Sequence, residues 1–135
     1  MPLSVGQLTD EFLGLFLRVL FKVEAAPKEL WVGLARQPAM ASPALADMAE
    51  PKVAGYRRQR LTSDDWMVDG TTALSRMVHW DNTQKDVWPP VDVYFLATSA
   101  DGSGMLLDWK PLRARRELMT GDTLEFPISI QFERK

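Results

Sequence analysis

The second half of the chain alternates short apolar segments with turn-forming residues. From residue 87 onward, these segments are separated by an Asp101-Gly102 pair and a Gly121-Asp122 pair, which favour tight reversals. Closely spaced apolar segments with turn signals between them are typical of antiparallel sandwiches and barrels. The pattern therefore predicts a mainly-β fold, a β-sandwich or jelly roll of about eight strands.

Residues 91–98 (VDVYFLAT) have the clearest strand pattern, because they are rich in β-branched and aromatic side chains. Pro89 and Pro90 cannot donate ladder hydrogen bonds, so we expect this strand to begin directly after them. Pro127 indicates a bulge or an edge position in the last strand. The eight predicted strands are residues 30–35, 56–61, 66–68, 71–80, 91–98, 105–109, 113–119 and 123–133.

Strict alternation in residues 71–80 divides that segment into two faces. We expect Val78 and Trp80 to share one face with Leu74, and Ser75 to lie on the opposite face.

The N-terminal part of the chain follows a helical period instead. Apolar residues at spacings of three and four predict a helix over residues 4–22, and Ser4 followed by Gln7 fits a capping box. Further leucines widen the apolar face beyond that of an ordinary amphipathic helix. We expect the helix to be buried under the sheet; the alternative is that part of its surface packs on a neighbouring subunit.

Residues 36–55 have no strand pattern and consist largely of Ala, Pro and Met. A connection of this length is longer than most, so we expect it to be functional or mobile. Its mild apolarity favours a contact loop or arm over a free linker, and Met40 and Met48 are its candidate contacts. The chain is interpreted as one domain, residues 1–135, with a β-rich core over 56–135 and strand 30–35.

Composition narrows the classes of function. The 135 residues suit a single domain, and the contents of hydrophobic residues (46%) and charged residues (25%) are ordinary for a globular protein. The absence of cysteine excludes disulfides, thiolate metal sites and cysteine catalysis. A net charge of -2 argues against a general nucleic-acid coat, and we expect no specific nucleic-acid partner.

The N-terminus does not resemble a secretory signal, because it lacks a basic region and carries Asp10 and Glu11. The apolar run 12–23 is interrupted by Arg18 and Lys22 and is too short to cross a bilayer. We therefore expect synthesis and assembly in a cytoplasm, without a membrane partner.

No group of residues indicates catalysis. His79 is the only histidine and lies in a predicted strand without a nucleophile motif nearby. Most aspartates lie in or beside turns, and the SADGSG segment around Asp101 does not match a calcium loop. Neither GxGxxG nor GxxxxGK occurs. We expect no enzyme activity, no catalytic residues, no metal and no cofactor.

Tryptophan and arginine give the candidate contact residues. Five tryptophans in a small domain are more than a core easily accommodates, and two arginine clusters lie in predicted strands. Both residue types are favoured at protein interfaces. With the two methionines, the candidate partner-binding residues are Trp31, Trp66, Trp88, Arg57, Arg58, Arg60, Arg113, Arg115, Arg116, Met40 and Met48.

The order of several short motifs resembles small phage virion proteins that are commonly described as tail-fibre proteins. The motifs are LWVGLA, GYRRQ, VW, VDVYFLAT, LLDWKPL and GDTLEF, at residues 30–35, 55–59, 87–88, 91–98, 106–112 and 121–126. The Ala- and Met-rich segment 38–54 departs from that family, whose members tend to be Gly-rich and acidic there. The resemblance implies a virion structural protein and supplies no catalytic residues.

On this basis, we expect a capsid cement or decoration protein that binds between subunits of the assembled shell, as an oligomer and with the major capsid protein or other virion proteins as partners. The mechanism would be mass action, since binding the assembled lattice alone stabilises it. One alternative is a tail or fibre-adaptor protein that binds a receptor. A second alternative is a carbohydrate-binding module built on exposed tryptophan.

Overall fold

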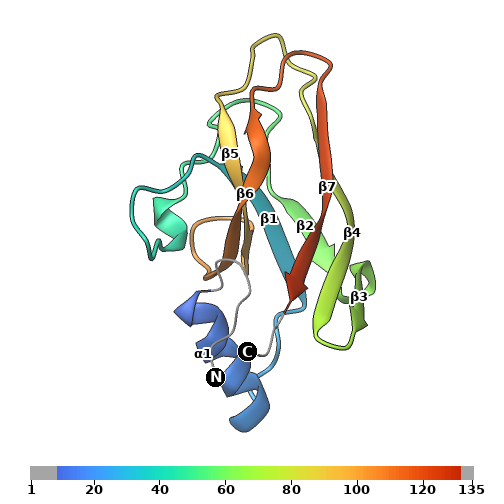
Figure 1. The fold of residues 1–135 in the computed structure, drawn as a ribbon. Coiled ribbons are helices and arrows are strands. Elements are labelled where there is room, and N and C mark those ends of the chain that lie inside the picture. The colour runs from blue at the N-terminus through green and yellow to red at the C-terminus, as the bar shows by residue number, and fades with distance from the viewer. Residues whose placement is uncertain (1–8, 132–135) are drawn as a thin grey trace.

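A computed structural model describes residues 9–131 of the chain. Within them, seven antiparallel strands form two sheets, and helix α1 (Asp10–Phe21) lies at one end (Figure 1). The sheets have the strand orders β2-β1-β5-β6 and β3-β4-β7. The strands are β1 (Glu29–Ala35), β2 (Gln59–Thr62), β3 (Trp66–Asp69), β4 (Thr72–Asp81), β5 (Val91–Ala97), β6 (Leu106–Arg116) and β7 (Thr123–Gln131). The mainly-β sandwich is confirmed.

The two sheets enclose the main core. Val32 and Leu96 of the first sheet pack in one apolar cluster with Val78, Trp80 and Ile128 of the second. Each of these side chains is nearly inaccessible to solvent. The period-two pattern of the sequence therefore corresponds to burial between the sheets.

Helix α1 begins at Asp10 because Thr9 is extended and caps it. The Thr9 hydroxyl accepts a hydrogen bond from the Phe12 N–H (3.1 Å) and donates one to the Leu106 carbonyl (2.5 Å). The second bond fixes the start of the helix to β6. The predicted capping residues Ser4 and Gln7 lie outside the described residues.

Segment 36–55 covers the outer face of the four-stranded sheet. Leu45 and Met48, beside the short 3₁₀ helix η1 (Leu45–Asp47), pack in a second apolar cluster with Phe95 and Trp109. The segment lies against the sheet on the side away from β4 and β7 (Figure 1). It is therefore a third layer of the domain and does not project as an arm.

Two boundaries differ from the prediction for identifiable reasons. The strand expected over residues 56–61 shortens to β2, because Tyr56 and Arg58 bind Glu50 instead of entering the ladder. The expected break near Pro111 does not occur. Since β6 is an edge strand, it accommodates a proline, as β7 accommodates Pro127. This edge position confirms the interpretation of Pro127.

The predicted faces of β4 are wrong on one side of a bulge. The pairing of β4 with β7 shifts register between Leu74 and Met77, beside the pair Met77–Pro127. As a result, Ser75 is buried on the same side as Val78 and Trp80.

Replacing Ser75 with alanine should lower the free energy of unfolding by about 1–3 kcal/mol. The Ser75 hydroxyl accepts a hydrogen bond from the buried Ile128 N–H (2.8 Å), which the variant leaves without an acceptor. Urea unfolding followed by tryptophan fluorescence measures the change. Ser63→Ala, at an exposed turn, is the matched control. Equal midpoints for the two variants would contradict this role for Ser75.

Candidate interaction surfaces

The polar groups around the sole histidine are not arranged for nucleophilic catalysis. His79 is exposed on β4, with its Nε2 atom 3.7 Å from Asp81 Oδ2, and the Thr123 hydroxyl donates to Asp81 Oδ1 (2.6 Å). The order is hydroxyl, carboxylate, imidazole, whereas an activated nucleophile must contact the imidazole itself. Over residues 9–131, no cluster of three or more His, Asp or Glu side chains could hold a metal ion.

The most extensive polar network lies between segment 36–55 and the sheet. The Arg58 guanidinium binds both carboxylate oxygens of Glu50, at 2.9 and 2.8 Å, and donates to the carbonyls of Ser99 (2.9 Å) and Asp101. It also lies 5.1 Å from the centre of the Phe95 ring. Arg58 is buried with its partner half-covered, so this pair is an internal tie between loops.

Tyr56 completes this network. Its hydroxyl donates to Glu50 Oε1 (2.7 Å) and accepts from the Leu34 N–H (3.0 Å). Burial, together with the negative charge of Glu50, raises the pKa of Tyr56 well above its usual value, so the phenol keeps its proton. The site is close-packed, since a β-carbon at Gly33 would meet the Phe95 ring and Glu50 Oε1. The arrangement holds structure and has no free reactive group.

Three of the predicted contact residues are internal. Trp88 is 1% exposed and belongs to the main core, where its ring meets Tyr56 edge-on. Met48 belongs to the second apolar cluster and Arg58 to the ion pair. All three side chains are less than a tenth exposed.

The remaining candidates occupy separate places. Trp31 and Arg60 are direct cross-strand neighbours on β1 and β2, on the outer face of the four-stranded sheet. Trp66 is partly buried against the main core. Arg57 and Met40 are exposed in connecting segments. The structure therefore does not gather the predicted residues into one site.

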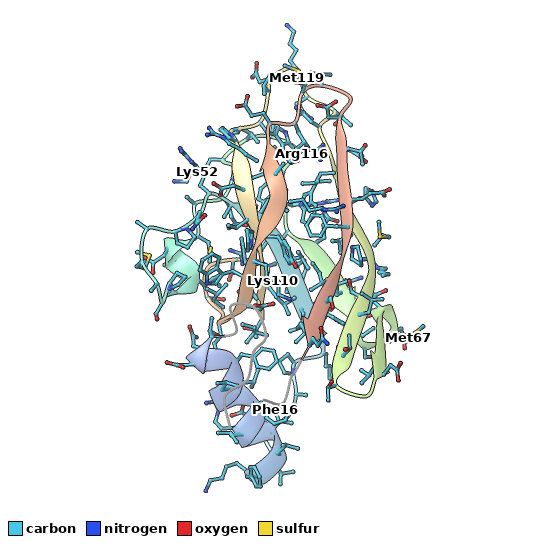
Figure 2. The ribbon with its side chains drawn as sticks, viewed as in Figure 1. Phe16, Lys52, Met67, Lys110, Arg116 and Met119 are labelled. Carbon is cyan, nitrogen blue, oxygen red and sulfur yellow. The ribbon has the colours of Figure 1, made fainter. Side chains whose placement is uncertain are left out.

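The second arginine cluster lies beside a groove. Arg113, Arg115 and Arg116 follow one another along β6, and the first and last of them line a groove of about 380 Å³ between β6 and β7. Arg116 marks this region in Figure 2. None of the three forms an ion pair with another described residue.

Helix α1 has the largest run of exposed apolar side chains. Leu17 and Leu20 are 53% and 56% exposed, Phe21 is 74% exposed and Val23 is 88% exposed. The helix packs on β6 through its other side and is not buried under the sheet (Figures 1 and 2). The list of candidate contact residues names none of them, although the width of the apolar stripe had indicated packing on a neighbouring subunit as the alternative to burial under the sheet.

A second exposed apolar area lies at the β3–β4 edge. Met67 and Leu74 are paired across the two strands, and Val68 and Met77 are also exposed. Figure 2 places Met67 at the side of the domain away from segment 36–55. The sequence gives no signal for this area, because which face of an edge strand is covered depends on the opposite sheet.

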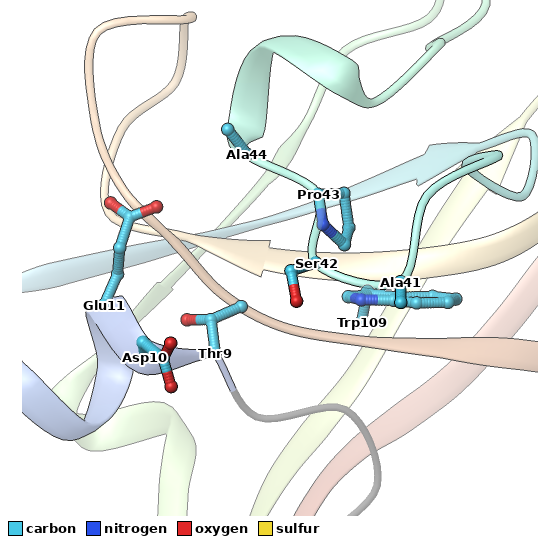
Figure 3. A pocket seen from close by; sticks show the side chains of 8 residues that line it. All are labelled: Thr9, Asp10, Glu11, Ala41, Ser42, Pro43, Ala44 and Trp109. Atoms are coloured by element: carbon cyan, nitrogen blue, oxygen red, sulfur yellow. The ribbon is translucent and has the colours of Figure 1, made fainter.

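A small pocket of about 230 Å³ separates the start of α1 from segment 36–55 (Figure 3). Trp109, Ser42 and the carboxylates of Asp10 and Glu11 line it. Both carboxylates lie in the first turn of α1, where negative charge stabilises a helix. In Figure 3 they do not converge on the Trp109 ring. Helix stability therefore accounts for these acids.

Comparison with known proteins gives one informative match. The sequence model of the family Gp80, described as "Podophage GP4 fiber I protein gp80", matches residues 15–131. The search of curated proteins finds no match. Among the described residues, no helix is long and apolar enough to span a membrane.

Proposed function

Because the chain belongs to the Gp80 family of podophage fiber I proteins, we propose that it is a fibre-type structural component of a phage virion that acts by binding. The exposed apolar side of α1 is the observation that best supports this function. A helix face of this kind on a soluble domain marks an interaction site more often than a neutral surface. The sandwich is the displayed body, and α1 is its attachment element.

The occupant of this helix face is a second copy of the chain. Leu13, Leu17 and Leu20 follow the spacing that helices use to pack on one another. The first turn carries Asp10 and Glu11, and the last turn carries Arg18, which also forms an exposed ion pair with Glu24 (3.3 Å). An antiparallel pair therefore places opposite charges and opposite ends of the helix dipoles side by side.

The residue after the helix supports the same interface. Val23 has a φ of 55°, a left-handed conformation that is unfavourable for a β-branched residue. Glycine is the usual residue at this position after a helix, so a valine there sacrifices stability. Its side chain is almost fully exposed and gains nothing inside its own domain. Contact with a second copy would give this side chain a role.

Val23→Gly should separate stability from association. We expect thermal unfolding to report a gain of about 1 kcal/mol, because the strained backbone is relieved. Sedimentation velocity should report weaker self-association, because an apolar contact is lost. A variant that is more stable yet associates as tightly as the wild type would assign Val23 no part in the interface.

Leu17→Gln combined with Leu20→Gln tests the interface as a whole. We expect about a tenfold or larger rise in the dissociation constant of the oligomer, with unfolding little changed, since both side chains are exposed. Lys22→Gln, at the exposed end of the same helix, is the control. A wild-type chain that stays monomeric throughout the micromolar range would refute self-association through α1.

A capsid cement or decoration role is the competing proposal, with the major capsid protein as partner. Partly exposed Trp31 and exposed Arg60 on the outer sheet face offer contacts for it. Gold-labelled antibody on intact particles distinguishes the two positions. Label at the tail or its fibres supports the fibre role, and label spread over the shell supports decoration.

A further inference from the structure

We propose that the groove between β6 and β7 binds an extended acidic segment of a partner protein, with an apolar side chain of that segment inserted between the two strands. The inference concerns a different surface from α1 and does not depend on self-association. It rests on three features: the apolar floor of the groove, its arginine rim and a lysine link between the sheets beside it.

The floor is formed by two aromatic rings in contact and by leucines. Tyr94 and Phe126 lie 4.8 Å apart between ring centres, and Leu112 and Leu124 line the same groove. Burial and the nearby Asp108 carboxylate raise the pKa of Tyr94 to about 12, so its hydroxyl is neutral at physiological pH. An apolar side chain can therefore enter without meeting a charge from the floor.

A link between the two sheets lies next to the groove, because Lys110 directly precedes its first lining residue on β6, Pro111. Lys110 on β6 donates from its Nζ atom to the Ser129 carbonyl on β7 (2.5 Å) and lies 3.7 Å from the Asp108 carboxylate. Lys110 marks this link in Figure 2. Because this cation is already paired, it adds little free positive charge. A bound segment would extend from here toward Arg116.

The rim carries more positive than negative charge. Arg113 and Arg116 line it, Arg115 is exposed on the same strand, and Glu125 is the one carboxylate among the lining residues. The chain as a whole has a net charge of -2, so this accumulation of guanidinium groups is local. Guanidinium groups without internal partners can form paired hydrogen bonds with carboxylates.

Protection of the edge strand from aggregation explains the arginines but does not explain the apolar groove beside them. Charged residues on an edge strand do discourage pairing between sheets, and arginine at any position would serve that purpose. An apolar groove beside the arginines does not help to prevent such pairing. A nucleic acid is also less suitable, because an enclosed apolar floor does not match a sugar–phosphate backbone. An acidic segment with an interspersed apolar side chain fits both parts.

The experiment uses a fluorescein-labelled synthetic peptide in which glutamate alternates with leucine and phenylalanine. Fluorescence anisotropy should detect binding to the full chain. Arg113→Gln, Arg115→Gln and Arg116→Gln together should weaken it at least about tenfold. Arg36→Gln, Lys52→Gln and Arg57→Gln together remove the same charge from exposed sites elsewhere and should leave binding nearly unchanged.

Two further measurements test the apolar floor and the location of the bound peptide. Leu112→Ala should weaken this peptide but leave a glutamate–serine peptide unaffected. A benzophenone in place of one phenylalanine should cross-link to β6 or β7 of the wild-type chain, which needs no variant to fold. Equal losses in the two triple variants, cross-links elsewhere, or tighter binding to a DNA duplex than to the peptide would each overturn the proposal.

Discussion

Replacing Arg58 with methionine is expected to lower the free energy of unfolding by about 3–5 kcal/mol. The variant leaves the Glu50 carboxylate half-buried without its guanidinium partner, and it removes donors to two loop carbonyls. Breaking one side of such a pair leaves an uncompensated charge, and this accounts for most of the loss. Segment 36–55 should also loosen, because Glu50 ties it to the sandwich.

Denaturant unfolding measures the loss, and limited proteolysis shows where it acts. New cleavage should concentrate within residues 36–55. Arg57→Met, one residue away and exposed, is the control. Glu50→Gln added to Arg58→Met should recover part of the stability, because the orphaned charge is removed. A double variant no more stable than Arg58→Met would show that the loss comes from the loop carbonyls instead.

Replacing Trp88 with alanine is expected to cost about 3–5 kcal/mol. The indole ring is 1% exposed, lies in the main core and meets the Tyr56 ring edge-on at 5.7 Å between centres. Its removal leaves a cavity that close-packed neighbours can fill only in part. Differential scanning calorimetry should report a fall in melting temperature larger than that of any surface variant.

Trp88→Phe separates packing from hydrogen bonding. The indole N–H of Trp88 has no hydrogen-bond partner among the described residues, so phenylalanine loses ring volume alone. We expect a clearly smaller loss than for alanine. Trp31→Ala, where the ring is partly exposed, should also cost less. A large loss for Trp88→Phe would indicate that the N–H contributes to stability after all.

The sandwich was predictable because burial between two sheets imposes a period of two on the sequence. The start of β5 after Pro90 and the edge position of Pro127 followed from the missing amide of proline. The bulge in β4 could not be predicted. It lies next to the pair that Met77 forms with Pro127, on a strand about fifty residues away, and the sequence of β4 alone alternates regularly.

The arginine clusters show why sites were harder to predict than strands. Arg57, Arg58 and Arg60 look equivalent in the sequence, yet Arg58 alone is buried, because Glu50 and Phe95 meet its side chain. The contact with Glu50 depends on the path of segment 36–55, which carries that residue. A signal was available there, since Leu45 and Met48 are spaced like residues on one face of a helical turn.

The prolines of the two edge strands reduce the risk that the free protein aggregates before a virion is assembled. A structural component of a virion accumulates to high concentration, and exposed sheet edges are common sites of edge-to-edge aggregation. Pro111 and Pro127 lie on edge strands and have no N–H, so each removes a hydrogen-bond donor that an added strand would need. The acidic segment proposed above would then have to be recognised at β6 and β7 through side chains, because a continuous backbone ladder is interrupted there.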